Sequence, residues 1–264
     1  VATNITPSDL PACSAPCGAG VTIVSPPLLG VTTITGGARP GDGPNLFHSF
    51  GDFSVGSGDI ANFLNDSGLT TTNIIGRVTG GNISNIDGII RTTGFDVGAL
   101  QANLFLVNPF GIVFGPHGSF DVGGSVSFST AQYLRLSDGG TSANFYANPT
   151  DVGSSILVMD PVANFGFLSS AAPAAYGFLT APDSSATITV QGSALSVHPG
   201  QSISLVGREV VIKGDTHPDQ TVQRAQLSAP SGRILLASTA SSGEFDSTIS
   251  FAAGPGLYFF LITS

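Results

Sequence analysis

The side chains that could act as acids, bases or nucleophiles are spread thinly along this chain. Glycoside hydrolysis would need two carboxylates that face each other across a substrate. Many aspartates stand beside a glycine instead, where aspartate is typical of turns; these are Asp42, Asp52, Asp59, Asp87, Asp138 and Asp215. Asp96 and Asp121 could share one face of a solenoid, although nothing in their spacing requires it.

The histidines and the glycine-rich loops offer no better site. The four histidines, which never pair at the spacing of metal ligands, are His48, His117, His198 and His217. No Gly-x-Ser-x-Gly nucleophile elbow occurs. The run from Gly76 to Gly81 lacks the Lys-Ser/Thr pair of a phosphate loop. We therefore expect no catalytic residues, no metal site and no cofactor, and we do not expect an enzyme.

The two cysteines, Cys13 and Cys17, are four residues apart, with Pro16 between them. They could close a small disulfide loop or remain free thiols. They could also form half of a metal site, but no second cluster of Cys or His lies near them in the sequence. We favour a disulfide or free thiols over a metal site, and a disulfide would suit an oxidising compartment.

The composition excludes several classes of partner. Among 264 residues, 17 acidic side chains outnumber 8 Lys and Arg, which gives a net charge of −9. No basic stripe exists, so we expect no nucleic-acid binding. Binding to an anionic membrane surface is disfavoured for the same reason. No segment approaches the roughly 20 apolar residues of a membrane helix, so we expect no integral membrane segment.

Residues 103–130 predict how the chain folds. Apolar residues alternate in four pairs, Leu104 and Leu106, Ile112 and Phe114, Phe120 and Val122, and Val126 and Phe128. Alternation of period two puts each pair on one face of a strand. Turn sequences rich in Gly and Pro separate the pairs. Strands this short need stacked neighbours to bury a core, which predicts a solenoidal sheet.

A second alternating series begins at Ala186. Its pairs start at Ile188, Leu195, Ile203 and Val210, so three steps span 22 residues. That length suits one circuit of a three-sided parallel β-helix. A β-sandwich is the rival architecture, but its strands are usually spaced about 8–12 residues apart. Helix signals are almost absent, so we expect an all-β protein.

We expect one domain over residues 1–264. A cap rich in Pro, Thr and Gly would cover residues 1–44, and coils that carry the motifs described below would cover 45–136. Residues 137–185 lack the short alternating strands seen on either side. This predicts an excursion from the solenoid over 137–185, with a hairpin near 155–159. Further coils would fill 186–264. The last apolar strand, around 258–262, would lack its next-coil partner or be covered by a local cap.

Four motifs carry a family resemblance. They are Asn45-Leu-Phe-His-Ser-Phe, Asn73-Ile-Ile-Gly-Arg-Val-Thr-Gly-Gly, Ile83-Ser-Asn-Ile-Asp-Gly and Ala102-Asn-Leu-Phe-Leu-Val-Asn-Pro-Phe-Gly-Ile-Val-Phe-Gly. Together they resemble the N-terminal secretion (TPS) domain of filamentous-haemagglutinin-like exoproteins of two-partner secretion, and are most similar to cyanobacterial members. The resemblance is strong over residues 20–135 and looser in the later coils.

The resemblance implies a fold and a route. The fold would be a right-handed parallel β-helix with an N-terminal cap and extra-helical hairpin or loop elements. The POTRA domains of a dedicated outer-membrane transporter would recognise the chain in the periplasm of a Gram-negative-type bacterium. The protein would be secreted or displayed at the cell surface, where this module would nucleate the downstream β-helix of the same exoprotein. The full-length protein would be an adhesin or haemagglutinin-like exoprotein, and we expect a monomer.

Two Asn-Pro motifs mark that family. Asn108-Pro109-Phe110-Gly111-Ile112 matches the second, with Phe in place of the middle Asn, while the first is present only as Gly43-Pro44-Asn45-Leu46. The candidate secretion-motif residues implied by the resemblance are Asn45, Leu46, Asn108, Pro109, Gly111 and Ile112. By themselves the residues predict a strand end at Asn108-Pro109, an Asx turn at Asn108 and a corner at Gly111. The corner is therefore either a structural turn or a direct contact with the transporter.

Parallel β-helices also carry polysaccharide lyases and glycosidases. A carbohydrate-active or glycan-binding β-helix is therefore the alternative function. A cleft with two carboxylates about 5–9 Å apart would favour hydrolysis, whereas a groove poor in acids would count against it.

Overall fold

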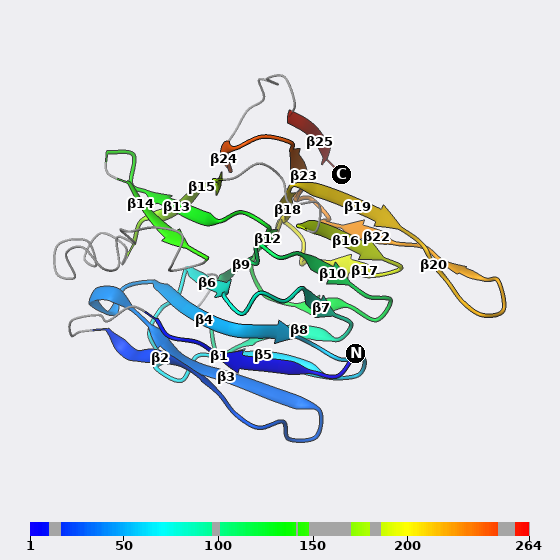
Figure 1. The fold of residues 1–264 in the computed structure, drawn as a ribbon. Coiled ribbons are helices and arrows are strands. Elements are labelled where there is room, and N and C mark those ends of the chain that lie inside the picture. The colour runs from blue at the N-terminus through cyan, green and yellow to red at the C-terminus, as the bar shows by residue number, and fades with distance from the viewer. Residues whose placement is uncertain are drawn as a thin grey trace.

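The computed structural model shows an all-β protein. It describes residues 1–10, 17–96, 101–140, 142–147, 170–179 and 186–247, and the backbone of 257–263. The regular elements of these residues are strands β1 to β25 and one short 3-10 helix, Pro40–Asp42. The strands form a curled, mostly parallel sheet, with smaller sheets around it (Figure 1). This arrangement is compatible with a β-helix.

Stacks of parallel strands build the body. The longest contains β4 (Asn45–Ser54), β6 (Asn73–Val78), β9 (Asn103–Val107), β12 (Val126–Ser129), β18 (Ile203–Gly207) and β23 (Arg233–Thr239). A second contains β3 (Val31–Ala38), β5 (Ile60–Leu64), β8 (Ile89–Thr93) and β11 (Ser119–Asp121). A third contains β7 (Ser84–Ile86), β10 (Ile112–Phe114), β16 (Thr187–Gln191) and β19 (Glu209–Lys213). A short pair joins β17 (Ala194–Ser196) to β22 (Gln226–Ser228).

The chain visits these stacks in a repeating order, and the register gives the length of each circuit. Ile188 pairs with Val210, 22 residues later, which confirms the predicted circuit. Residues 103–130 also form the four predicted short strands, β9 to β12. Leu104 pairs with Val126 at the same 22-residue separation, but Ile74 pairs with Leu104 only after 30 residues. The circuits differ because the loops between strands take up a variable number of residues.

The core lies inside the curled sheet and is built of aligned columns. One column runs through consecutive strands of the longest stack, and its members are all buried: Leu46, Ile74, Leu104, Val126, Ile203 and Ile234. Near the N-terminal end, the rings of Phe50 and Phe53 lie 5.0 Å apart between centroids. Period-two alternation therefore places each apolar pair where it can contact the next coil.

Antiparallel strands cover two parts of this body. Near the N-terminus, β1 (Asn4–Pro7) pairs with β4, and β2 (Gly18–Val24) pairs with β3. On the outer face of the longest stack lies an antiparallel sheet of β14 (Ser142–Tyr146), β13 (Tyr133–Ser137), β15 (Ala172–Phe178) and β24 (Gly243–Asp246). Buried Phe47, Ile75, Leu134 and Phe145 belong to a second apolar cluster between the stack and this sheet.

The antiparallel sheet begins earlier than residue 137, where we expected the excursion to start. Strand β13 starts at Tyr133, and its alternating Leu134 and Leu136 are both fully buried in the outer cluster. Alternation alone does not distinguish an outer strand from a coil strand, which is why the pattern placed this segment in the coils. The expected hairpin near 155–159 lies outside the described residues.

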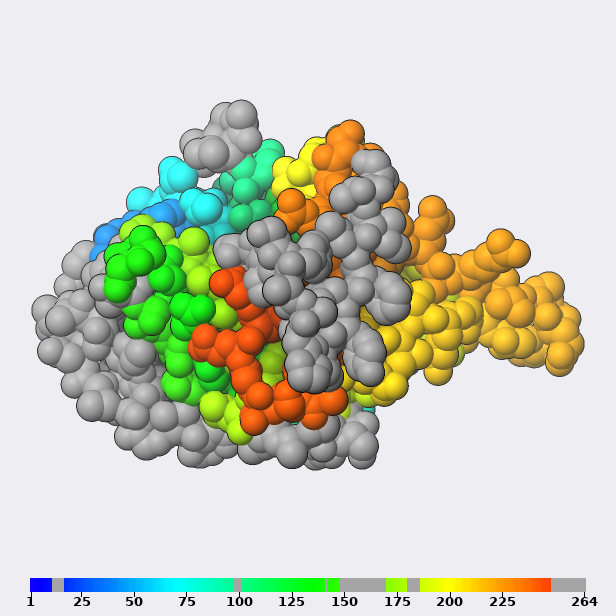
Figure 2. Space-filling view, turned by 90° about the horizontal axis from the view of Figure 1, so that it is seen from above, coloured from blue at the N-terminus to red at the C-terminus, as the bar shows by residue number. Residues whose placement is uncertain are grey.

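Two further elements lie near the C-terminal end of the stacks. Strands β20 (Asp215–Thr216) and β21 (Val222–Gln223) form a hairpin that stands away from the body (Figures 1 and 2). The expected strand around 258–262 is β25 (Leu257–Thr263), whose backbone pairs antiparallel with β23. Strand β25 thus closes the edge of the longest stack.

Candidate functional site

Asn45, from the first candidate corner, begins a ladder of asparagine side chains. Asn73 donates its amide to the Asn45 Oδ1 at 2.8 Å, and Asn103 donates to the Asn73 Oδ1 at 3.2 Å. The Asn103 Oδ1 then accepts the Ser125 backbone N–H at 3.0 Å. Asn45 is fully buried and donates to the carbonyl of Ala171, just before β15, at 2.8 Å. The ladder therefore fixes the coils in register and ties them to the antiparallel sheet.

Asn108, from the second candidate corner, is also fully buried. Its amide nitrogen donates to the Asn82 carbonyl at 3.0 Å and to the Ser84 Oγ at 2.9 Å. Its Oδ1 accepts the Phe110 N–H at 3.0 Å, which is the Asx turn that the sequence predicts. Asn108 thus joins its corner to the neighbouring coil through its amide nitrogen and holds the turn itself through its Oδ1.

The other residues of the two corners are mostly internal as well. Gly111 is buried with φ of +122°, which favours glycine, and its carbonyl accepts the Ser84 N–H at 3.0 Å. Leu46 and Ile112 belong to the core. Among the candidate residues only Pro109 is partly exposed, together with its neighbour Phe110. The folded corner therefore presents little more than these two side chains to a partner.

His48, inside the first motif, cannot serve as a proton donor near neutral pH. It is 1% exposed, with its Nδ1 3.3 Å from the Thr22 Oγ1 and its ring against Phe50 and Phe63. Burial, followed by the positive charge of Arg39, lowers the pKa of His48 to about 3. The imidazole is neutral and packs as part of the core.

Arg77 is a buried group that sequence reasoning missed. Its guanidinium donates to the Ser49 Oγ at 2.8 Å, the Tyr146 carbonyl at 2.8 Å and the Asp9 carbonyl at 3.0 Å. It also lies 5.0 Å from the centroid of the Phe145 ring. Burial lowers the pKa of Arg77 to about 10, so the group stays charged at neutral pH. The signal available in the sequence was an arginine within the otherwise uncharged run Asn73-Ile-Ile-Gly-Arg-Val, which forms strand β6 with every residue buried.

Arg77 therefore joins three parts of the chain that are far apart in sequence. Asp9 belongs to the N-terminal segment, Ser49 to β4, and Tyr146 to the antiparallel sheet. A planar group with donors pointing in several directions suits such a junction better than a lysine would.

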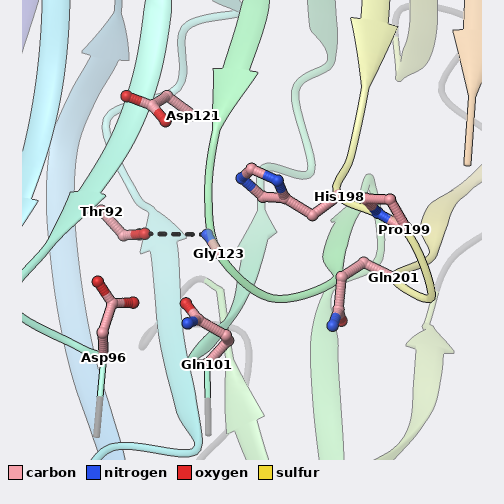
Figure 3. Close-up of a pocket in the computed structure, with 8 residues that line it drawn as sticks. All are labelled: Thr92, Asp96, Gln101, Asp121, Gly123, His198, Pro199 and Gln201. Carbon is pink, nitrogen blue, oxygen red and sulfur yellow. Dashed lines mark hydrogen bonds between the residues drawn. The ribbon is translucent and has the colours of Figure 1, made fainter. Parts of the chain in front are cut away.

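A polar groove of about 360 Å³ opens on the body near β11 (Figure 3). The residues that line it are Thr92, Asp96, Gln101, Asp121, Gly123, His198, Pro199 and Gln201. It brings together Asp96 and Asp121, the acids that the sequence could place on one face without requiring it. Both are exposed, whereas a general acid at neutral pH is usually held protonated by an apolar surrounding.

Three further expectations concern a metal site, a membrane-spanning helix and the cysteine pair. No cluster of three Cys, His, Asp or Glu side chains suited to a metal occurs in the described part of the chain. Within the same residues, no helix is long and apolar enough to cross a membrane. Cys17 is buried and has a partner, but Cys13 lies outside the described residues, so the disulfide between them stays a prediction.

Comparison with known proteins agrees with the motifs and the fold. A comparison with curated protein sequences finds no match. The family model of the TPS secretion domain matches residues 24–255, which include both corners, the asparagine ladder and Arg77. Domains of this family are secretion modules of two-partner secretion exoproteins rather than catalytic domains; their partner is an outer-membrane transporter, and export passes through the periplasm of Gram-negative bacteria. On this match the chain belongs to the TPS secretion domain family.

Proposed function

We propose that the POTRA domains of the transporter recognise this module as an extended chain in the periplasm, before it folds. The observation that carries the proposal is the burial of the motif residues. Asn45, Leu46, Asn108 and Ile112 are at most 3% exposed in the folded domain. A partner can read these side chains only while the chain is unfolded.

Strand addition is the mode of binding that suits such a chain. Many segments of three to seven residues form strands once stacked, but none buries a core alone. An extended segment of this kind can add to the open edge of a sheet in the transporter. Main-chain hydrogen bonds would supply affinity, and alternate side chains around Asn108 would supply specificity.

Folding outside the cell would then make export irreversible. We propose that the domain folds as a right-handed β-helix and is a monomer. Residues 1–44 would act as its cap, 45–136 and 186–264 as its coils, and 137–185 as an extra-helical excursion. Stacking on an existing coil is easier than forming the first, so the folded module would template a downstream β-helix of the same exoprotein. The complete exoprotein would act as an adhesin or haemagglutinin at the cell surface.

A binding experiment with the purified POTRA domains tests the unfolded-state proposal. A variant with Ile74→Asp and Phe128→Asp buries two charges in the core and should stay unfolded. The POTRA domains should bind this variant more tightly than the native domain. Tighter binding to the native domain would overturn the proposal.

The unfolded variant also separates recognition from stability at the second corner. Adding Asn108→Ala and Pro109→Ala to it leaves no folded structure to destabilise, so a loss of POTRA binding reports a contact in the extended chain. Asn85→Ala in the same background is the matched control. If the corner change has no more effect than the control, Asn108 and Pro109 are structural residues only.

A further inference from the structure

The groove near β11 lies where one of the three parallel stacks is interrupted. Strand β11 is the last member of its stack, whereas β17 of the following circuit pairs with β22 instead. Between β12 and β16 the chain makes its long excursion. The coils on either side of it remain in register where β12 pairs with β18 and β10 pairs with β16, so the break is confined to the stack of β11. The walls of the groove come from the segments on either side of this break: the ends of β8 and β11 on one side, and the corner after β17 on the other (Figure 3).

Hydrogen bonds hold several of the walls in place before any ligand arrives. The Thr92 Oγ1 accepts the Gly123 N–H at 3.4 Å, which leaves the hydroxyl hydrogen of Thr92 free to donate. The Gln201 Oε1 accepts the Ser125 hydroxyl at 3.0 Å. The Gln201 N–H donates to the His198 carbonyl at 3.0 Å, so His198 sits on a closed turn. A prearranged site of this kind loses little entropy on binding.

Gly123 gives the groove its depth. Its missing side chain lets the amide of Gln101 lie over the backbone, since a Cβ at Gly123 would stand 1.8 Å from the Gln101 Oε1. Figure 3 shows Gly123 between Gln101 and Asp96 on one side and the His198 ring on the other. An alanine at position 123 would push Gln101 into the space of the groove.

The polar groups of the groove favour a ligand rich in hydroxyl groups. The carboxylates of Asp96 and Asp121 only accept hydrogen bonds, while Gln101, Thr92 and His198 can donate as well as accept. A hydroxyl group satisfies both kinds of neighbour. The ring faces of His198 and Pro199 add a flat, less polar wall. A volume of about 360 Å³ lies at the lower end of the range for small-molecule sites.

The charges around the groove narrow the class of ligand further. Two carboxylates, in a chain with a net charge of −9, repel sulfated and uronic saccharides. Arg91 is paired in register with Asp121 on the neighbouring strand, so its positive charge offsets part of the field that would attract a lone cation. We propose that this groove binds a short segment of a non-acidic saccharide, a role separate from secretion.

Titration of the purified 264-residue chain with a set of disaccharides tests the proposal. Cellobiose and chitobiose are the neutral probes, the glucosamine dimer is the cationic probe, and a sulfated heparin disaccharide is the acidic probe. NMR should show shifts of the Gly123 amide and of the Gln101 and Gln201 side-chain amides with a neutral probe, and none with the acidic one. The proposal is overturned if neither neutral probe shifts these signals at about 10 mM, or if only the glucosamine dimer does.

Variants of the groove provide the second half of the test. Asp96→Asn with Gln101→Ala should weaken binding about ten- to a hundredfold, because a hydrogen bond to a charged group and one to an amide are lost. Gly123→Ala should weaken it too, by displacing Gln101. Asp219→Asn, on the tip of the distant hairpin, is the control and should bind as the native chain does. Unchanged affinity in the double variant would place the saccharide elsewhere and refute the assignment.

Discussion

Replacing Asn108 by alanine should destabilise the folded domain far more than its place in a turn suggests. The side chain makes three hydrogen bonds at zero exposure, to the Asn82 carbonyl, the Ser84 hydroxyl and the Phe110 N–H. A typical hydrogen bond contributes about 1 kcal/mol, and each buried partner left unsatisfied adds a desolvation cost. We therefore expect a loss of about 3–5 kcal/mol. The Asx bond and a loosened turn alone would account for only about 1–2 kcal/mol.

Urea unfolding of the purified variant, followed by fluorescence and circular dichroism, measures this loss. A total stability of about 5–15 kcal/mol is typical, so the transition midpoint should move by a large fraction of its native value. Asn85→Ala is the matched control, because the Asn85 amide is partly exposed and makes one long bond of 3.4 Å to the Ile83 carbonyl. Its cost should stay near 0.5 kcal/mol or below, as is usual for such positions (about ±0.5 kcal/mol). Equal costs for the two variants would refute the structural role assigned to Asn108.

Three further perturbations test other parts of the structure. Arg77→Ala leaves the buried Ser49 hydroxyl and the partly buried carbonyls of Tyr146 and Asp9 without their charged donor, and it should cost about 3–5 kcal/mol. Exposed Arg224→Ala should cost under about 0.5 kcal/mol, and similar urea midpoints for both variants would contradict the junction described above. Because the pKa of His48 is lowered to about 3 in the folded state, the unfolded state takes up its proton first as pH falls below about 6.5; the domain should lose about 1.4 kcal/mol per pH unit between there and about pH 3. His48→Gln should flatten that dependence in unfolding measured at neutral pH and at pH 5, and an unchanged slope would show that His48 is not its source. Gly111→Ala forces a side chain onto a φ of +122° and should cost about 1–3 kcal/mol in the same assay, whereas no loss would mean that the corner relaxes freely.

The local parts of the fold were predictable because period-two alternation and turn residues are themselves local signals. Residues 103–130 form β9 to β12 as expected, and the 22-residue circuit from Ile188 to Val210 follows from even spacing. The pairing of Val126 with Ile203 was not predictable, since the excursion lies between these two strands. No local pattern states which strand continues a stack after such an interruption.

The candidate site was predictable only in part, for a similar reason. The Asx turn at Asn108 involves near neighbours in the sequence and could be expected. The bonds of Arg77 join segments around Asp9, Ser49 and Tyr146, so its role depends on the docking of the cap and of the antiparallel sheet. The groove of Asp96 and His198 likewise exists only once two coils lie beside each other.

Export of the chain by its transporter tests the central claim most directly. The 264-residue chain, behind a signal peptide and ahead of a reporter, would be produced in a Gram-negative host with and without the transporter. We predict that the reporter reaches the medium only when the transporter is present, and that removing the POTRA domains abolishes its release. Equal release without the transporter, or retention in the periplasm with it, would contradict the assignment of this domain as a secretion-targeting module.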